Sequence, residues 1–232
     1  MTAEHPTANP APAATPTGAM IRTLGLVSGI CGLVIVGSYQ GTYDAVAANK
    51  RIAMERAVFK VVPAARSIEE YYALEGGSIA KAGAEAAPAG AVKFFAGYDE
   101  AGKLVGVAAE GGAKGYADTV RIMFGYDPAC QCVKNIGVVS MRETPGIGDK
   151  ILKDKDFLAN FEQLDARLNA EMGALAHEIR TVKHGSKADA WQVDAIAGAT
   201  ITSRAVGKAI NDTAQVLLPK LVPNLGTIGS KS

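Results

Sequence analysis

The sequence predicts an α+β fold, in which one N-terminal transmembrane helix precedes a domain with an antiparallel sheet and flanking helices. Three features predict this class. An uncharged, apolar run covers Thr23–Tyr43. Four runs rich in β-branched and aromatic residues follow one another between residues 91 and 141. An amphipathic helical pattern covers residues 203–218.

Composition divides the 232 residues into five segments. The first is rich in Pro, Ala and Thr and has no large apolar residue apart from Met1. Such a segment cannot bury enough apolar surface to become ordered. The expected segments are a flexible tail over 1–19, a transmembrane helix over 20–43, a helical stalk and loop over 44–89, the main domain over 90–222 and a C-terminal tail over 223–232.

The apolar run has the length of a membrane span. As a helix, its 21 residues would extend about 31 Å, which matches a hydrocarbon core of about 30 Å. Arg22 and Asp44 bracket the run, and Tyr39 and Tyr43 suit the membrane interface. A cleaved signal peptide is the alternative, but signal h-regions are shorter and lie nearer the N-terminus. We therefore expect a retained anchor.

The elements after the anchor follow from periodicity and turn residues. Residues 44–74 show a helical pattern, which Pro63 interrupts and which Gly76-Gly77 can cap. The segment AKAGAEAAPAGA predicts a loop. The strands predicted next are AVKFFAGYD, KLVGVAAE, TVRIMFGYD and VKNIGVVSM. The remaining predictions are a helix over Asp156–Leu168, short strands over Glu178–Val182 and Trp191–Ile196, and a final helix over 203–218.

Composition also limits the function. Lys and Arg number 24 against 23 Asp and Glu, so the chain has no excess positive charge for nucleic-acid binding. Three cysteines are too few for a disulfide framework, and three histidines are too few to expect a haem or zinc site. No dinucleotide fingerprint, phosphate-binding loop or nucleophile elbow is present. We therefore expect neither a metal site nor catalytic residues, and any redox chemistry needs a cofactor held by other means.

The cysteines and histidines have simple interpretations. Cys130-Gln131-Cys132 falls at an expected hairpin tip, where a metal site would need further ligands and a C-x-C disulfide would be strained. We interpret it as a structural or incidental pair, with its role left open. His177 and His184 are expected on the surface. Cys31, in the middle of the span, is expected to act as a small apolar residue.

The segment with most chemical information is Asp194–Arg204, DAIAGATITSR. It joins an expected strand to an expected helix, and Gly198 permits a tight turn there. Thr200, Thr202 and Ser203 are candidate N-caps. A helix N-terminus presents unpaired N–H groups and favours phosphate, and a threonine hydroxyl there could receive a phosphoryl group. On local physics alone, an ordinary cap is the simpler interpretation.

The string Asp194–Thr200 resembles the flavinylation motif of bacterial FMN-binding domains: Asp, two variable residues, Ser or Thr, Gly, Ala, Thr. In that family a flavin transferase moves FMN from FAD onto the last threonine, which corresponds to Thr200. The sequence departs from the motif at Ala197, which is not the acceptor position. Thr202 is a weaker alternative acceptor. The resemblance implies covalent FMN near Gly198, Ala199, Thr200, Thr202 and Ser203.

A second segment, RETPGIGDKI over Arg142–Ile151, resembles another part of the same family. Its Pro and Gly residues predict a rigid loop with close backbone approach. Taken alone, this loop could be a strand-to-helix turn without a ligand. The resemblance implies that it lies against the flavin, and Gly115-Tyr116 resembles the start of a core strand in the same domain. The loop residues that the resemblance assigns to the cofactor are Glu143, Thr144, Pro145, Gly146 and Gly148.

The order and spacing of these motifs resemble the family of the G subunit of the Rnf complex, with the C subunit of the sodium-translocating NADH:quinone oxidoreductase as a close relative. The resemblance implies an electron-carrier subunit of an ion-translocating ferredoxin:NAD oxidoreductase, with residues 90–222 as the FMN-binding domain. The implied partners are the other membrane and peripheral subunits and, during maturation, a flavin transferase. Three alternatives remain: the quinone-reductase relative itself, a non-enzymatic flavin-binding sensor or anchor module, and an anchored binding domain without flavin.

The orientation has two conflicting indications. Lys50, Arg51 and Arg56 follow the span and outnumber Arg22 before it, which favours a cytoplasmic domain. The resemblance favours the periplasmic or exterior side of the inner membrane. Because the three basic residues lie seven or more positions past Tyr43, we give the resemblance more weight and expect a single-pass protein with an exterior C-terminal domain.

Overall fold

The computed structural model describes residues 16–83 and 87–229. The chain forms two compact units, residues 1–50 and residues 51–232, and each is treated by itself. Most of the expected flexible tail lies outside the described residues. Its last residues, from Thr17 on, are helical.

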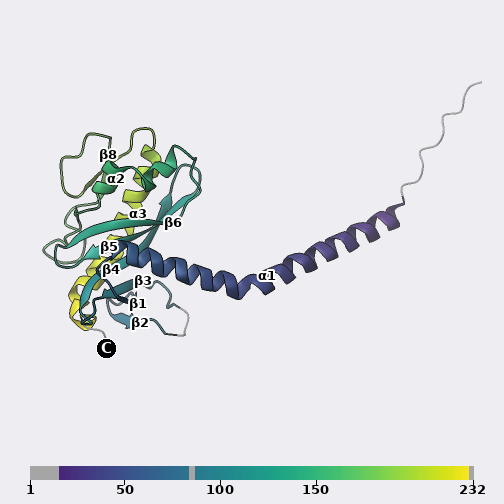
Figure 1. Ribbon diagram of the computed structural model, residues 1–232, viewed down its shortest axis with the longest axis horizontal. Helices are drawn as coiled ribbons and strands as arrows, with labels where there is room; N and C mark the ends of the chain where they lie inside the picture. The colour runs from purple at the N-terminus through teal and green to yellow at the C-terminus, as the bar shows by residue number, and fades with distance from the viewer. Residues whose placement is uncertain (1–15, 84–86, 230–232) are drawn as a thin grey trace, which may run out of the picture. The chain divides into compact units, whose positions relative to one another are not determined.

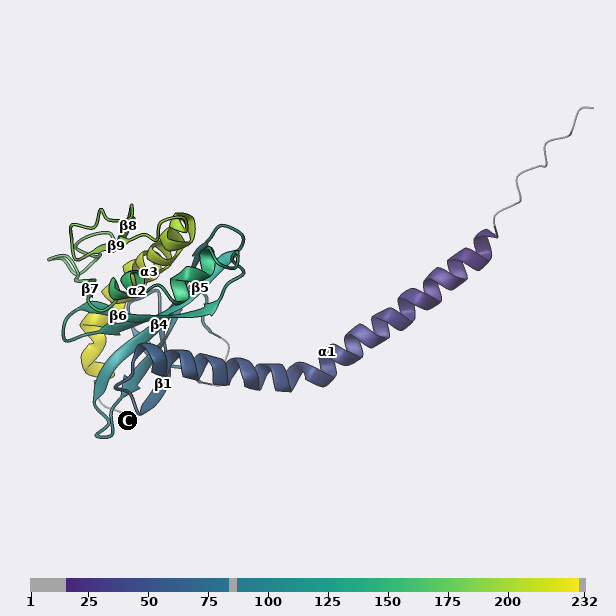
Figure 2. The same ribbon diagram turned by 45° about the horizontal axis from the view of Figure 1, so that its top comes forward.

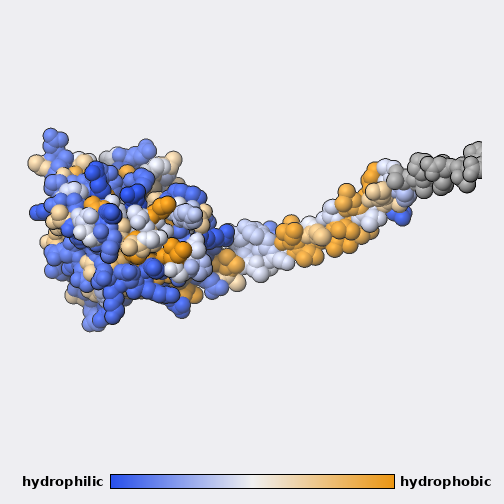
Figure 3. Space-filling model, turned by 90° about the horizontal axis from the view of Figure 1, so that it is seen from above, coloured by the Kyte–Doolittle hydropathy of each residue, from blue (hydrophilic) through white to orange (hydrophobic). Residues whose placement is uncertain are grey.

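The described part of the first unit is helical and belongs to α1, Thr17–Val61. Every described side chain from residue 16 to residue 50 is exposed. Figure 3 shows apolar side chains along this part of the chain. By length and composition, α1 is a candidate membrane span. It starts three residues before the expected span and continues past residue 43 into the second unit, where it ends two residues before Pro63 because proline cannot donate a helical hydrogen bond.

The second unit is built on a seven-stranded antiparallel sheet in the order β2-β1-β3-β4-β5-β6-β7 (Figure 1). Its strands are β1 Ser67–Ala73, β2 Ile79–Lys81, β3 Val92–Tyr98, β4 Leu104–Lys114, β5 Thr119–Asp127, β6 Cys132–Ser140 and β7 Leu164–Asp165. A separate parallel pair comprises β8 Arg180–Val182 and β9 Gln192–Asp194. The helical elements are η1 Gly148–Leu152, α2 Lys155–Ala159, α3 Thr200–Leu221 and η2 Val222–Thr227. The expected α+β class with an antiparallel sheet is confirmed.

Both faces of the sheet are covered, which explains the continuous apolar runs of its central strands. Phe94 and Phe124 belong to the core cluster that includes α3, whereas their neighbours Phe95 and Met123 pack with the last turns of α1. The alternation follows from the two-residue period of a strand. Gly111 lets α3 approach β4 closely, since a Cβ at this position would collide with the carbonyl oxygen of Ala209.

The expectation of a helix over SIEEYYA is wrong, because this segment forms β1. Tyr71 and Ala73 are buried while Tyr72 between them is half-buried, which is a strand pattern. The Tyr71 ring stacks on Phe94 of β3 at 5.7 Å, and its hydroxyl lies 3.1 Å from that of Tyr98. These contacts with a neighbouring strand outweigh the helix propensity of the two glutamates.

The helix expected over Asp156–Leu168 is also shorter than its apolar spacing suggests. Asp154 caps α2 by accepting a hydrogen bond from the Phe157 N–H at 2.9 Å, but the helix ends at Ala159. The chain then turns so that Leu164 lies opposite Val133 in the sheet. Phe161 and Leu164 therefore reach the core from a turn and a strand.

The compact unit includes residues that composition assigned to the stalk and to the C-terminal tail. β1 and β2 belong to the main sheet. Beyond α3, Ile228 is buried in the core, and the Asn224 side chain donates to the Gly77 carbonyl oxygen at 2.8 Å. Figure 2 shows β8, β9 and α2 grouped beside α3, near the start of this helix.

Candidate functional site

A cavity of about 520 Å³ lies where three segments distant in sequence meet. They are the turn between β4 and β5, the loop after β6, and the first turn of α3. Its volume falls in the range of about 300–1,000 Å³ that is usual for ligand pockets. Its lining residues are Tyr116, Glu143, Thr144, Ile147, Gly148, Gly198, Ala199, Thr200, Ile201 and Thr202.

The first turn of α3 offers unpaired backbone donors. Ala199 is the N-cap and makes no side-chain cap hydrogen bond, so the expectation that a Thr or Ser at 200–203 caps the helix is wrong. The first N–H with a helical partner is that of Ser203, which donates to the Ala199 carbonyl oxygen at 2.9 Å. Among the described residues, no acceptor meets the N–H groups of Thr200, Ile201 and Thr202. Such donors at the positive end of a 22-residue helix favour a phosphate group.

The turn that leads into α3 is held in place by hydrogen bonds. Gly198 has φ +82°, a conformation that glycine adopts without strain. The buried Ser203 hydroxyl donates to the Ala199 carbonyl oxygen at 2.9 Å and accepts from the Ile196 N–H at 3.1 Å. Ser203 therefore stabilises the turn from inside and does not line the cavity. Ala197, the departure from the flavinylation motif, is exposed and also lies outside the cavity.

Asn160, which sequence reasoning missed, fixes the strand before this turn. Its side-chain oxygen accepts from the Asp194 N–H at 3.0 Å, and its side-chain nitrogen donates to the Asp194 carbonyl oxygen at 3.3 Å. The same oxygen accepts from the Lys187 ammonium at 3.0 Å. Partial burial lowers the pKa of Lys187, although the nearby Asp194 opposes this shift. A single Asn after a short helix carries no motif that would identify it beforehand.

The candidate acceptors differ in accessibility. Thr200 is half-buried, and its hydroxyl has no hydrogen-bond partner within the described residues. Thr202 is only 2% exposed, and its hydroxyl donates to Glu143 Oε2 at 2.8 Å. Successive residues of a helix are about 100° apart, so these two side chains leave α3 about 200° apart around its axis. The geometry therefore leaves the Thr200 hydroxyl available and engages that of Thr202.

The loop after β6 contributes Glu143, Thr144 and Gly148 to the cavity wall. The Gly148 N–H donates to the Thr144 carbonyl oxygen at 3.0 Å and closes a tight turn. Pro145 and Gly146 form the exposed outer part of this turn and do not line the cavity. Gly146 has φ +78°, so its role is conformational.

An apolar rim, defined as Tyr116, Ile147 and Ile201, borders the cavity. These side chains are 69%, 50% and 49% exposed, respectively, and each comes from a different one of the three segments. Sequence reasoning singled out Tyr116 only as part of a family motif and did not assign Ile201 to the site. The signal for Ile201 was an apolar residue on the outer face of an amphipathic helix, directly after the motif threonine.

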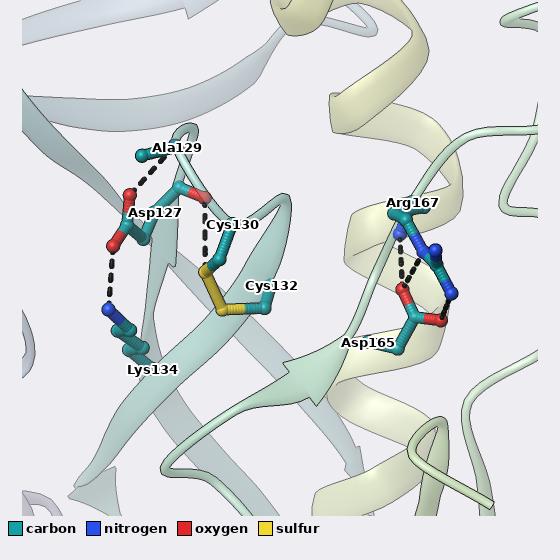
Figure 4. The surroundings of a disulfide bond; sticks show 7 residues. All are labelled: Asp127, Ala129, Cys130, Cys132, Lys134, Asp165 and Arg167. Carbon is teal, nitrogen blue, oxygen red and sulfur yellow. Dashed lines mark hydrogen bonds and ion pairs between the residues drawn. A yellow bond between two sulfur atoms is a disulfide. The ribbon is translucent and has the colours of Figure 1, made fainter.

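The cysteine pair lies away from this cavity. Cys130 and Cys132 form a disulfide at the tip of the β5–β6 hairpin (Figure 4). The sequence alone leaves the role of this pair open. The Cα atoms are 5.2 Å apart, within the usual range for a disulfide, and Gln131 between them has φ +51°, a conformation that is uncommon for a residue other than glycine. Beside it, Asp127 accepts from the Lys134 ammonium at 2.8 Å. Burial raises the pKa of Asp127, but the hydrogen bonds from Lys134 and from the backbone lower it more.

The histidines are exposed, as expected. His177 stacks on Trp191 at 5.4 Å, and His184 Nδ1 lies 3.0 Å from the Ala195 carbonyl oxygen. Within residues 16–83 and 87–229, no group of three or more His, Cys, Asp or Glu side chains is arranged to hold a metal ion.

Comparison with known proteins finds a family model that matches part of the domain that holds the cavity. Residues 115–215 match the model of the FMN-binding domain family. The G subunit of the ion-translocating oxidoreductase complex of Pasteurella multocida is 32% identical over 108 residues, which are 46% of this chain and 48% of that protein. The protein of the same name from Aliivibrio fischeri is 34% identical over 110 residues, 47% of this chain and 48% of that protein. The match thus spans about half the length of these relatives.

Two crystal structures share the fold. NqrC of Shewanella oneidensis matches with a TM-score of 0.61 and 22% identity, covering 78% of this chain and 98% of that one. The C subunit of the Na(+)-translocating NADH-quinone reductase of Parabacteroides distasonis matches with a TM-score of 0.55 and 16% identity, covering 80% and 96%. At these identities the likeness concerns the fold alone. Over residues 115–215, the chain is thus similar to the FMN-binding domain family.

Proposed function

We propose that this chain is a membrane-anchored electron-carrier flavoprotein that holds FMN through a phosphoester bond to Thr200. The observation that supports this most is the setting of the Thr200 hydroxyl. It is accessible, has no partner among the described residues, and stands at a helix N-terminus whose first three N–H groups have no acceptor. The adjoining cavity is large enough for a ligand and has an apolar rim.

The attachment is a group transfer from FAD, catalysed by a separate flavin transferase. The Thr200 oxygen attacks the phosphorus on the FMN side of the FAD pyrophosphate. A bond forms between this oxygen and phosphorus, the P–O bond to AMP breaks, and the hydroxyl proton is lost as AMP leaves. The reaction involves no net oxidation or reduction.

The residues of the chain then hold and shield the group. The N–H groups of Thr200, Ile201 and Thr202 would donate to the phosphate oxygens, and the α3 dipole would favour the negative charge. The apolar rim would limit the contact of the bound ring system with water. When bound, FMN supplies one- and two-electron redox chemistry, which requires no catalytic side chain on this chain.

Within the cell, we assign the chain to an Rnf-type ion-translocating ferredoxin:NAD oxidoreductase complex. The similarity to the G subunits of ion-translocating oxidoreductase complexes supports this assignment. Its partners are the other membrane and peripheral subunits. The runner-up is the C subunit of a sodium-translocating NADH:quinone oxidoreductase, which the shared fold favours.

The disulfide gives an independent argument for the orientation. Disulfides persist in oxidising compartments and are rare in the cytoplasm, so Cys130–Cys132 supports a domain on the periplasmic or exterior side of the inner membrane. External protease should then remove the flavin-bearing fragment from intact spheroplasts. If the fragment is digested only after lysis, the orientation is the reverse.

The attachment is tested on the full chain coexpressed with a flavin transferase. Denatured wild-type protein should show in-gel flavin fluorescence and an intact mass increased by one FMN phosphoester. Thr200→Ala should lose both while keeping its circular dichroism, and Thr200→Ser should keep part of the label. Labelling that survives in Thr200→Ala but is lost in Thr202→Ala would assign the acceptor to Thr202. Co-purification with integral membrane subunits distinguishes a component of the complex from a sensor or anchor module.

A further inference from the structure

We infer that Glu143 is a positioning residue, whose carboxylate fixes the first turn of α3 against the β4–β5 turn and thereby sets the place of Thr200. The inference rests on the proposed attachment at Thr200. It adds a positioning role to the expectation that Glu143 belongs to the cofactor site.

The hydrogen bonds of Glu143 connect all three segments around the cavity. Its Oε2 accepts from the Thr202 hydroxyl at 2.8 Å. Its Oε1 accepts from the N–H groups of Ala117 at 3.2 Å and Asp118 at 3.5 Å. Both oxygens are therefore engaged with protein groups, and those groups lie 25 to 59 residues away in sequence.

Two glycines make room for this carboxylate. A Cβ at Gly148 would lie 2.6 Å from Glu143 Cβ and 2.9 Å from its Oε2. A Cβ at Gly115 would collide with Glu143 Oε1. The two glycines flank the Glu143 side chain from the β4–β5 turn and from its own loop. The tight fit gives the carboxylate one position, as a positioning role requires.

The bond to Thr202 determines how the first turn of α3 is rotated. Thr202 points inward to Glu143 and is almost fully buried. Since Thr200 leaves the helix about 200° away, this bond keeps the Thr200 hydroxyl from turning into the protein. Without it, the first turn can rotate or fray, because helix ends are held only by such contacts.

The hydrogen-bond partners of Glu143 also leave the N–H groups of the proposed phosphate site without competition from its carboxylate. A carboxylate near a helix N-terminus is stabilised by the dipole, but it would compete with phosphate if it accepted from the helix N–H groups. Glu143 instead accepts from a side-chain hydroxyl and from N–H groups of another turn. The N–H groups of Thr200, Ile201 and Thr202 remain available.

The test measures the rate of flavin transfer from FAD to the full-length chain by purified transferase, together with the thermal unfolding of each variant. Glu143→Ala and Thr202→Val each remove the bond to α3 and should slow transfer at least tenfold. Glu143→Gln and Thr202→Ser keep a hydrogen-bonding partner and should recover most of the rate. The double variant Glu143→Ala/Thr202→Val should be no slower than the slower single variant, since one interaction is lost in all three.

The control is Glu110→Ala, which removes a carboxylate on β4 that pairs with Arg121 outside the cavity. It should transfer at the wild-type rate. An equal loss of rate in Glu143→Gln and Glu143→Ala would overturn the inference and point to the charge itself. So would a normal rate in Thr202→Val, and this variant decides the question even if Glu143→Ala does not fold. Failure of the wild-type chain to accept flavin, or labelling of Thr200→Ala, would instead overturn the proposed function.

Discussion

Replacement of Asn160 by Ala should destabilise the second unit, because this buried side chain pairs both backbone groups of Asp194. Asn160 is 5% exposed, and its bonds to the Asp194 N–H and carbonyl oxygen measure 3.0 and 3.3 Å. Each buried backbone group left without a partner costs about 1–3 kcal/mol. The Lys187 ammonium also loses its bond to the Asn160 side chain, but it can turn into solvent. The Phe157 carbonyl oxygen keeps a donor in the variant, the backbone N–H of residue 160. The N–H and the carbonyl oxygen of Asp194 therefore lose the Asn160 side chain as partner, whereas the carbonyl oxygen of the exposed Asp156, which also accepts from this side chain at 3.3 Å, can be hydrated.

We expect a loss of about 2–4 kcal/mol in the free energy of unfolding, since water entering the gap will compensate part of the cost. For a unit of this size, the melting temperature should fall by about 5–15 °C. The measurement is thermal and urea unfolding of the detergent-solubilised chain, followed by circular dichroism. Gln163→Ala, which truncates an exposed amide three residues away, is the matched control. A loss below about 1 kcal/mol in Asn160→Ala, or one equal to that of the control, would refute the reasoning.

Three further predictions concern the loop, the rim and pH. Gly146→Val forces a β-branched residue into φ +78° and should change the flavin absorption or redox potential of labelled protein more than the far-UV circular dichroism; unchanged flavin spectra and potential would count against a wall at 144–148. Tyr116→Ala should increase the quenching of flavin fluorescence by iodide, whereas Val216→Ala, which shortens an exposed side chain on α3 outside the cavity, should not; equal quenching in both would remove the rim from the site. Burial raises the pKa of Tyr126 to about 12. The contribution of neutral Tyr126 to the free energy of unfolding is therefore complete below pH 10 and falls by about 3 kcal/mol as the pH rises from 10 to 12. Tyr126→Phe should reduce this loss in alkaline unfolding curves, and an unchanged curve would contradict the assignment.

Much of the site could be predicted because two of its three segments are neighbours in a hairpin. β5 and β6 pair antiparallel with Arg121 opposite Ser140, so the end of β6 lies beside the start of β5. The turn at Gly115 and the loop at Glu143 therefore meet at one end of the sheet. The third segment could be placed there only by resemblance. Between β7 and α3, the chain makes a long excursion through the β8–β9 pair, and no local pattern shows where it returns.

The errors arose where non-local contacts decide the structure. SIEEYYA contains good helix formers, and only its pairing with β3 makes it a strand. The hydrogen bond between Thr202 and Glu143 could not be predicted for the same reason. In the sequence, a threonine at a helix start and a glutamate in a loop both look available to a ligand. In the structure, the Thr202 hydroxyl donates a hydrogen bond to Glu143, 59 residues away in the chain. Sequence identified the residue types of the site, whereas the structure separates Thr200, which is available, from Thr202, which is engaged.

The position of the disulfide separates it from the electron path that we propose. Cys132 begins β6 and lies opposite Asp127, the last residue of β5, whereas Tyr116 and the cavity lie before the first residue of that strand. Nine strand residues span about 25 Å, so the cysteine pair and Thr200 stand near opposite ends of the sheet. Reduction of a disulfide requires contact between its sulfur and the reductant. We therefore expect no direct exchange between a group tethered at Thr200 and the cysteine pair of the same chain.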